Sequence, residues 1–305
     1  MDWKKNMAQV LSIPPLMNEP MRFHTSLRVG GPAEMLAFPA NRDELKALLL
    51  IAHSENVPVF LIGQGTNLLV KDEGIRGIVI NLARFSPAFS FINCSVKAGP
   101  GIPVVKLARK AIEKGLGGLE FAIGIPGSLG GAIYMNAGAY GHSIGDLVKE
   151  VKTMDYQGKE VTRGRHDIHF YYRKSSFQEE QSIIVEASLE LSPADKDEML
   201  QKVADIQTTR KTKQPQKPSA GSVFRNPPGQ PAGYLIEKAG LKGRSVGGAQ
   251  VSTLHGNFIV NSGGATAEDV LTLIKWVQSE VLESQGVDLE LEIKIVGKEG
   301  IDRGD

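Results

Sequence analysis

The spacing of apolar residues along the first hundred positions predicts alternating helices and strands. Asn41 and Glu44 have the spacing of a capping box, which predicts that a helix starts there. Apolar residues then recur at helical spacing, at Leu45, Leu48, Leu49 and Ala52. Apolar runs over 57–63 and 75–81 predict two buried strands, and residues 90–97 predict a third, weaker strand.

The middle of the chain continues this pattern. Pro103 can open a helix, and Gly115 is suited to its C-cap. The inward face of that helix would carry Val104, Ala108, Ala111 and Ile112. The next predicted elements are a hairpin of 148–156 with 159–163, a strand over 182–191, and a helix from Ser192 and Pro193 to about Arg210.

The last third predicts one more helix and one more strand. Thr266 is a helix cap and Gly286 a helix end. The inward face between them would carry Val270, Leu273, Ile274, Val277 and Val281. Residues 287–295 alternate strictly between apolar and polar, which predicts a half-buried strand. The elements together predict an α+β protein.

Length, charge and cysteine content narrow the class of protein. The 305 residues suffice for two or three domains. A formal net charge of +1 gives no reason to expect a nucleic-acid partner. Cys94 is the only cysteine, so an internal disulfide is impossible. With no signal-peptide pattern at the start, we expect a cytoplasmic protein.

Two long stretches, 121–145 and 247–267, contain no Asp, Glu, Lys or Arg. Their length alone would make each a candidate membrane span. Glycines, Pro126 and several asparagines in them break helices and add polar groups. We therefore interpret both stretches as buried loops that meet a ligand, and we expect no membrane partner.

A glycine loop, GQGTNLLV at 63–70, follows a predicted strand, as a dinucleotide fingerprint would. Leu68 stands where the third glycine of that fingerprint belongs, and the following residues look extended rather than helical. The loop therefore does not predict a Rossmann site, and a plain glycine turn is the alternative.

A second loop, GIPGSLGGA at 124–132, holds four glycines and Ser128. Backbone N–H groups can approach a pyrophosphate where no Cβ intervenes. A buried glycine-rich turn explains this loop alone equally well. The two loops together, without a Rossmann pattern or a Walker lysine, favour a non-Rossmann flavin site.

Seven motifs then occur in a familiar order: HTSLRVGGPAEM, GQGTNLLV, GLEFAIGIPGSLGGAIYMNAGAYG, YYRKSSF, AGSVFRNP, AGYLIEKAGLKG and LELEIKIVG. From about residue 20 to 297 the chain resembles the UDP-N-acetylenolpyruvoylglucosamine reductases (UDP-N-acetylmuramate dehydrogenases). Because 177–182 is short, it resembles the subclass without the tyrosine-bearing loop insertion.

The resemblance implies an α+β fold with an FAD-binding domain of the vanillyl-alcohol-oxidase type, followed by a C-terminal α+β substrate domain. The FAD-binding region would span 1–205, as two α+β subdomains of about 1–85 and 86–205. The substrate domain would span 206–305, with its last residues packing back on the first subdomain. The Pro- and Lys-rich stretch at 211–222 lies near this boundary.

The resemblance also implies the reaction. NADPH would reduce FAD, and the flavin would reduce UDP-N-acetyl-3-O-(1-carboxyvinyl)-glucosamine to UDP-N-acetylmuramate. Hydride would come from the flavin and a proton from a serine. The protein would then be a flavoprotein oxidoreductase of peptidoglycan synthesis, serving cell-wall biogenesis, cell shape, cell division and the cell cycle. We expect a monomer whose partners are a UDP-sugar and NADPH.

Three residues match the family's catalytic positions. Arg173, in YYRKSSF, is a cation suited to a carboxylate, although taken alone it suggests a structural ion pair. Ser222, in AGSVFRNP, matches the proton donor, although taken alone it is a loop hydroxyl. Glu292 matches the acidic residue of the last strand, where a solvated polar face is the alternative.

The remaining site residues follow from the same motifs. The cofactor-binding residues would be Gly63, Gly65, Thr66, Asn67, Leu68, Gly124, Ile125, Pro126, Gly127, Ser128, Gly130, Gly131, Ala132, Asn136 and Gly138. The substrate-binding residues would be Arg210, Lys213 and Asn226, with a solvated basic linker as the alternative for the first two. The histidines show no convincing ligand set, so we expect no metal.

Two rival functions remain open. One is a related flavin oxidase with a small alcohol or sugar substrate, which would turn over with oxygen and without NADPH. The other is a nucleotide-binding regulatory module that has lost catalysis, which would take up no FAD. Leu254, His255 and Gly256 depart from the usual family residues before NFIVN, which leaves the contacts of that loop open.

Overall fold

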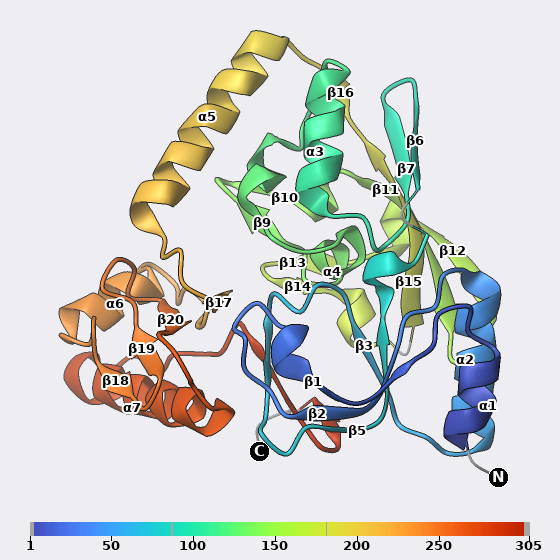
Figure 1. The fold of residues 1–305 in the computed structure, drawn as a ribbon. Helices are drawn as coiled ribbons and strands as arrows, with labels where there is room; N and C mark the ends of the chain where they lie inside the picture. The colour runs from blue at the N-terminus through green and yellow to red at the C-terminus, as the bar shows by residue number, and fades with distance from the viewer. Residues whose placement is uncertain (1–2, 87, 181, 302–305) are drawn as a thin grey trace. The chain divides into compact units, whose positions relative to one another are not determined.

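A computed structural model of the chain describes residues 3–86, 88–180 and 182–301. The chain divides into two compact units (Figure 1). Unit 1 comprises Met1–Leu16, Met35–Gln64 and Gly77–Arg210, and unit 2 comprises Met17–Glu34, Gly65–Arg76 and Lys211–Asp305. The helices are α1 (Trp3–Gln9), α2 (Arg42–Ser54), α3 (Val104–Glu113), α4 (Leu129–Tyr134), α5 (Lys196–Lys213), α6 (Ala232–Lys238) and α7 (Ala267–Gln285).

Strands occur in both units, and three of them carry the chain across a unit boundary. The boundary strands are β1 (Leu16–Pro20), β2 (Pro32–Ala37) and β5 (Ile75–Asn81). Those of unit 1 are β3 (Val59–Ile62), β6 (Phe89–Ile92), β7 (Ser95–Ala98), β8 (Leu116–Gly117), β9 (Gly138–Ala139), β10 (His142–Ser143), β11 (Val148–Asp155), β12 (Glu160–Gly164), β13 (Phe170–Tyr171), β14 (Lys174–Ser175), β15 (Ser182–Glu190) and β16 (Ser192–Pro193). Those of unit 2 are β4 (Leu68–Val70), β17 (Ser219–Ser222), β18 (Ser245–Val246), β19 (Ala249–Val251), β20 (Phe258–Asn261), β21 (Lys294–Gly297) and β22 (Gly300–Ile301).

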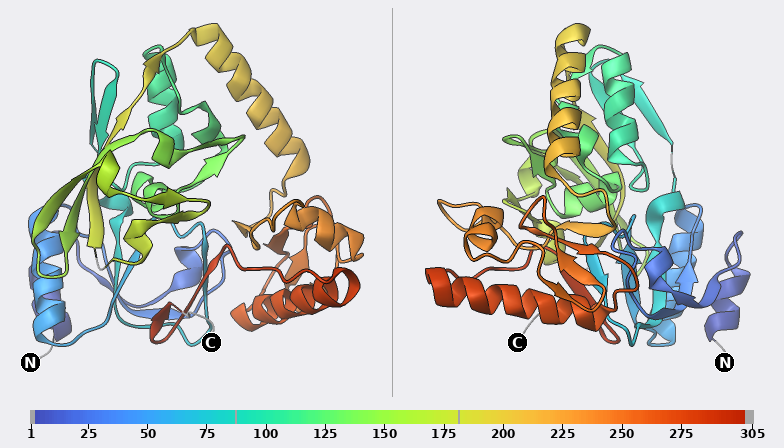
Figure 2. Two further views of the ribbon diagram at one scale, coloured as in Figure 1. Left: turned by 180° about the vertical axis from the view of Figure 1, so that it is seen from behind. Right: turned by 60° about the vertical axis from the view of Figure 1, so that its left-hand side comes forward.

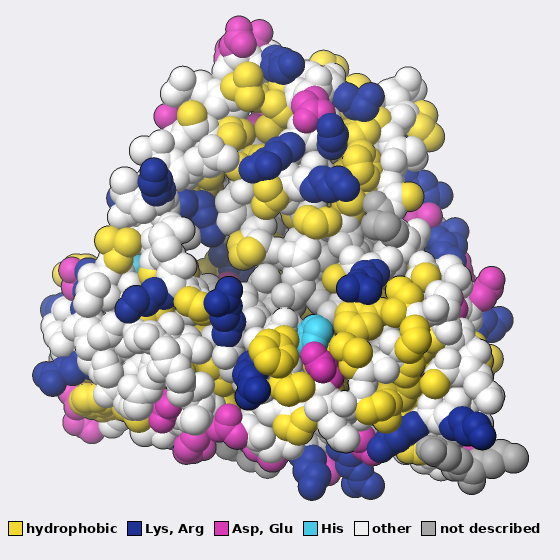
Figure 3. Space-filling view, viewed as in Figure 1, with side chains coloured by type: hydrophobic (Ala, Val, Ile, Leu, Met, Phe, Trp, Pro, Cys, Tyr) yellow, Lys and Arg dark blue, Asp and Glu magenta, His cyan; other side chains and the backbone are white. Residues whose placement is uncertain are grey.

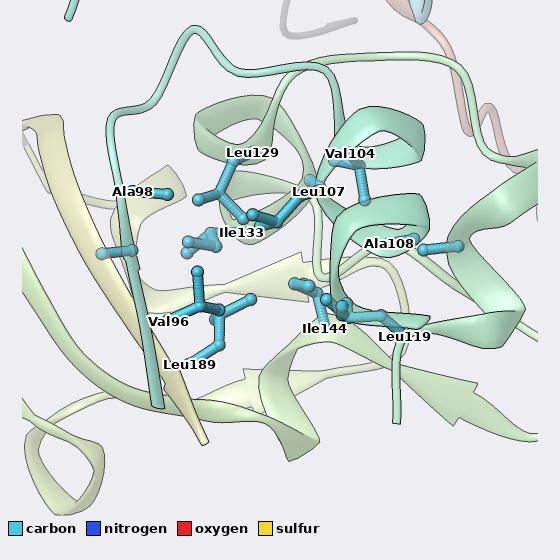
Figure 4. Close-up of a cluster of buried hydrophobic side chains, with 14 of the residues drawn as sticks. Val96, Ala98, Val104, Leu107, Ala108, Leu119, Leu129, Ile133, Ile144 and Leu189 are labelled. Atoms are coloured by element: carbon cyan, nitrogen blue, oxygen red, sulfur yellow. The ribbon is translucent and has the colours of Figure 1, made fainter. Parts of the chain in front are cut away.

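One core of unit 1 forms between the five-stranded sheet β12-β11-β15-β7-β6 and the helices α3 and α4. Figure 4 shows side chains from both helices and from β7 and β15 pointing into one cluster. Helix α3 is amphipathic, with Leu107 and Ala108 fully buried and Lys106, Arg109 and Lys110 exposed. Figure 3 shows Lys and Arg side chains gathered over this helix.

A second core of unit 1 lies where α1 and α2 pack beside one another (Figure 1). The predicted capping box of α2 is confirmed, because Asn41 Oδ1 accepts the Glu44 N–H at 3.0 Å. Its predicted inward face is buried as expected. Strand β5 pairs in parallel with β3, from Ile78 opposite Val59 to Asn81 opposite Ile62.

Unit 2 is built on the antiparallel sheet β17-β20-β19-β18, against which α7 packs (Figure 2). The predicted start and end of α7 are confirmed, with a complete capping box at Thr266 and Gly286 in the left-handed conformation at φ 68°. Asp72 adds a second cap, since its carboxylate accepts the Ala267 and Glu268 N–H groups at 2.9 and 3.0 Å.

Strand β4 pairs in parallel with β21, from Lys294 opposite Leu68 to Val296 opposite Val70. The segment that contains the first predicted glycine loop is therefore joined to the C-terminal end of the chain. The domain boundaries expected at 85 and 205 remain a prediction. Among the described residues, no helix is both long and apolar enough to cross a membrane.

Two predicted elements begin or divide differently in the structure. The single strand predicted at 90–97 is a hairpin of β6 and β7, turned at Asn93 with φ 53°. The helix predicted from Ser192 begins only at Lys196, because Pro193 pairs with Leu116 in a strand. Asp195 then accepts the first N–H groups of that helix and so fixes its start.

The long C-terminal strand predicted over 287–295 is wrong, and the regular ladder begins only at Lys294. The backbone before it changes partners. Glu290 O accepts the Arg225 N–H, the Glu292 N–H goes to Val223 O, and the Lys294 N–H goes to Asn67 O. The predicted alternation still describes burial, since Leu289 and Ile293 are buried and Glu290 is exposed.

Candidate functional site

The two predicted glycine loops meet within unit 1. Gly63 directly follows β3, and a Cβ built there would collide with Ser128 Oγ of the second loop. Ser128 is buried and precedes α4. The glycine at 63 therefore lets the first loop come within contact distance of the second, as a shared cradle requires.

The glycines of the second loop differ in what surrounds them. A Cβ on Gly124 would collide with the Arg210 side chain, and a Cβ on Gly130 would lie 2.8 Å from Pro100 Cβ. Gly127 has φ 130°, a conformation open only to glycine. Gly131 is exposed, and a Cβ there would meet only Ser128 Oγ, at an ordinary 3.5 Å. Gly131 is thus the helical glycine with room for a ligand.

The rest of the first loop belongs to unit 2, where its neighbours are protein groups. Gly65 has φ 62°, and a Cβ there would collide with the His24 carbonyl oxygen. Asn67 donates from Nδ2 to Glu292 O at 3.2 Å and accepts the Lys294 N–H at 3.0 Å. Asn67 and Leu68 therefore hold the segment that carries Glu292, and their contact with a cofactor stays a prediction.

Ser222 and Glu292 come together in unit 2. Ser222 ends β17 opposite Phe258 of β20. The carbonyl of the next residue, Val223, accepts the Glu292 N–H at 2.8 Å. Two of the three predicted catalytic residues are seventy positions apart in the sequence. They therefore lie on two backbone segments that a hydrogen bond joins directly.

A cavity of about 290 Å³ opens at Ser222. Its lining residues all come from unit 2: Ser222, Asn226, Pro231, Gly233, Tyr234, Glu237, Leu254, His255, Gly256 and Asn257. Asn226 is exposed there and accepts the Ala232 N–H through Oδ1 at 3.0 Å. The structure thus places one predicted catalytic and one predicted substrate-binding residue around the same hollow.

Arg173 lies in unit 1, in the two-residue turn between β13 and β14. Its φ of 55° is unusual for a residue other than glycine. Its guanidinium carbon lies 5.2 Å from the centroid of the Tyr172 ring. The side chains of Asn136, Ser175 and Gln178 connect this turn to the end of α4 and the residues just after it.

Arg210 and Lys213 occupy the last turn of α5. Burial lowers the pKa of the Arg210 guanidinium, and Tyr140 nearby acts in the opposite direction. Lys213 is exposed. Arg210 therefore lies against Gly124 of the second glycine loop, whereas Lys213 belongs to the start of unit 2.

His255 lines the cavity, but sequence reasoning missed it because the histidines showed no convincing set of metal ligands. Its Nδ1 accepts the Asn257 N–H at 3.2 Å, and its ring packs edge-on against Phe258, 4.8 Å between centroids. Burial lowers the pKa of His255, with Lys242 acting in the same direction. The only sequence hint was the unusual Leu254-His255-Gly256 segment.

Asn257 is a second residue that sequence reasoning did not assign to the site. Its side chain binds both backbone groups of Phe224, accepting the N–H at 2.9 Å and donating to the carbonyl at 2.7 Å. Its own carbonyl accepts the Val223 N–H at 2.9 Å. Asn257 therefore fixes the backbone immediately after Ser222.

Comparison with known proteins gives two family matches. Residues 214–296 match the C-terminal domain of UDP-N-acetylenolpyruvoylglucosamine reductase, and residues 33–164 match an FAD-binding domain. The second match bears out the expected FAD-binding fold within an α+β chain.

Whole-length relatives agree with these matches. The chain is similar to a UDP-N-acetylenolpyruvoylglucosamine reductase of Caldanaerobacter subterraneus subsp. tengcongensis, 46% identical over 283 residues, covering 92% of this chain and 93% of the relative. A reductase of the same name from Clostridium botulinum strain Hall is 42% identical over 285 residues, covering 93% of each. The crystal structure of UDP-N-acetylenolpyruvylglucosamine reductase (MurB) from Thermus caldophilus superposes with a TM-score of 0.79 at 37% identity, covering 93% of this chain and 99% of that one.

Proposed function

Because this chain belongs to the UDP-N-acetylenolpyruvoylglucosamine reductase family, we propose that NADPH is its electron source and Ser222 its proton donor. It is an FAD-dependent oxidoreductase that forms UDP-N-acetylmuramate for peptidoglycan synthesis. The proposal rests above all on Ser222, which lines a cavity and is joined through Val223 to Glu292.

The residues of unit 1 fit the flavin cofactor. Gly63 and Ser128 bring the two glycine loops into contact, and the exposed Gly131 beside them has room for a methyl group. Gly127 takes a backbone conformation that a side chain would strain. We propose that these residues, together with Ile125, Pro126 and Ala132 of the same loop, hold the pyrophosphate part of FAD.

Bound FAD, once reduced by NADPH, would supply the hydride for the terminal vinyl carbon of the substrate. Hydride addition places a second negative charge next to the substrate carboxylate, and that charge needs preorganised stabilisation. Arg173 is permanently cationic and would bind this carboxylate. Glu292, as an acidic group, would be directed at the same carboxylate. Ser222 would donate a proton to the carbon next to the one that receives the hydride.

The substrate diphosphate requires cations, which Arg210 and Lys213 of α5 would supply. Partial burial of Arg210 strengthens its attraction to an anion, because less water screens it. Asn226, which lines the cavity of Ser222, would also contact the substrate.

An anaerobic half-reaction experiment tests this function. Holoenzyme is first reduced with NADPH, and the enolpyruvyl substrate is then added while the flavin absorbance is followed. We expect reoxidation of the flavin and formation of UDP-N-acetylmuramate. A flavin that stays reduced would overturn the proposal, and turnover with oxygen and a small alcohol would favour the oxidase instead.

The preference for NADPH, the monomeric state, the cytoplasmic location and the division into domains at 205 stay predictions. The cofactor contacts of Thr66 and Gly138 also stay predictions. Gly138 has a structural reason of its own, since a Cβ there would lie 2.5 Å from the His142 carbonyl oxygen.

A further inference from the structure

Asn136 lies in the segment predicted to bind FAD, yet its side chain binds protein. It follows α4 in the left-handed conformation, at φ 44°, and only 6% of it is exposed. Its Nδ2 donates to Tyr171 O at 2.8 Å, and its Oδ1 accepts the Gly145 N–H at 3.0 Å. One amide group therefore joins two backbone segments, at Tyr171 and at Gly145.

The segment that receives the Nδ2 hydrogen bond carries Arg173, two residues beyond Tyr171. Arg173 adopts φ 55°, a conformation that persists only where the surroundings impose it. Gln178 donates to the Arg173 carbonyl at 3.4 Å and to Tyr134 O at 2.8 Å. Ser175, fully buried, also donates to Tyr134 O, at 2.7 Å.

The three side chains thus connect the Arg173 turn to the end of α4. Asn136 holds the strand that enters the turn, and Ser175 holds the strand that leaves it. Gly145 makes room for this arrangement, because a Cβ there would lie 2.8 Å from Asn136 Oδ1. The Asn136 amide offers both the donor and the acceptor that the two backbone segments need.

We infer that Asn136 is a positioning residue for Arg173 rather than a contact of the flavin. It fixes the backbone conformation from which the guanidinium projects. This inference rests on the proposed function for the role of Arg173. The tether itself, meaning the hydrogen bonds of Asn136 to Tyr171 and Gly145, is independent of that function.

The test is Asn136→Asp in the holoenzyme. Asp keeps the acceptor for the Gly145 N–H. It replaces the Nδ2 donor with a second oxygen, so the hydrogen bond to Tyr171 O is lost. We expect the KM for the enolpyruvyl substrate to rise at least tenfold, while FAD affinity and flavin reduction by NADPH stay within twofold of the original protein. In the Arg173→Ala background the same change should have little further effect, because Asn136 acts through Arg173.

A second measurement does not depend on the substrate. Hydrogen exchange of the peptide covering 170–175 should become at least tenfold faster in Asn136→Asp, and Gln178→Ala should show the same change to a smaller degree. Thr153→Val serves as control, since it removes a hydrogen bond from another buried side chain of unit 1, to Val161 O, outside the Arg173 turn.

The outcomes separate the possibilities. Unchanged exchange at 170–175 overturns the inference, and so does a tenfold loss of FAD affinity in Asn136→Asp with normal exchange there. If the original protein fails to reduce the enolpyruvyl substrate, the proposed function fails, while faster exchange at 170–175 still supports the tether.

Discussion

The clearest test of the flavin cradle is Gly131→Ala. Gly131 lies in α4, is exposed, and has room for a methyl group beside Ser128 Oγ. Alanine in place of a helical glycine should stabilise the apoprotein by about 0.5–1 kcal/mol. If the FAD pyrophosphate packs against this glycine, the same methyl group overfills that contact at a cost of about 1–3 kcal/mol.

The two effects have opposite signs, which makes the test specific. We expect FAD to bind about 5- to 150-fold more weakly, from the 1–3 kcal/mol cost. The apoprotein should melt at an equal or slightly higher temperature. Flavin fluorescence during titration of the apoprotein gives the Kd, and calorimetry of the apoprotein gives the melting temperature.

Gly130→Ala is the matched control, one residue earlier in the same helix. Its Cβ would lie 2.8 Å from Pro100 Cβ, so we expect the apoprotein to lose about 1–3 kcal/mol of stability. An unchanged Kd for FAD in Gly131→Ala would refute the placement of the cofactor at this glycine. A weaker Kd accompanied by a lower melting temperature would show that the change acts on the fold instead.

Three further predictions concern unit 2. Ser222→Ala should leave flavin reduction by NADPH intact and abolish reoxidation by the enolpyruvyl substrate; equal loss of both half-reactions, in stopped flow, would contradict its role. Asn257→Ala should cost about 2–4 kcal/mol in urea unfolding, because it strips both backbone groups of buried Phe224 of their partners; Asn261→Ala, which breaks more exposed hydrogen bonds, should cost less. The folded-state pKa of His255 is lowered from 6.5, so the unfolded chain binds more protons and the free energy of unfolding should fall as pH drops below about 6.5. His255→Gln should lack this part of the pH dependence, and identical pH profiles for both proteins would disprove it.

The helices were the most predictable elements, because their signals are local. The cap of α2 at Asn41 and the ends of α7 at Thr266 and Gly286 depend on groups only a few residues apart. Strand limits were less predictable, because a strand ends where its partner does. Pro193 extends a strand because Leu116 lies opposite, and the backbone from Glu290 to Lys294 passes from residues 223–225 to Asn67.

The same contrast holds for the site. The sequence alone determined that two glycine loops exist, and the motif order predicted catalytic roles for Arg173, Ser222 and Glu292. The tertiary structure decided which glycine is too closely packed for a methyl group and which has room for one, as Gly130 and Gly131 show. The physical reason is that a glycine is the same letter in the sequence whether protein atoms or a ligand occupy the space that its Cβ would fill.

Tertiary structure also decided which backbone groups bind the side chains near the predicted catalytic residues. Asn136 and Asn67 occur in glycine-rich motifs, so the sequence assigned them to the cofactor. In the fold their amides bind distant backbone at Tyr171 and Glu292. An amide's partners are set by whichever chain segment passes within about 3 Å, and that is a property of packing rather than of sequence.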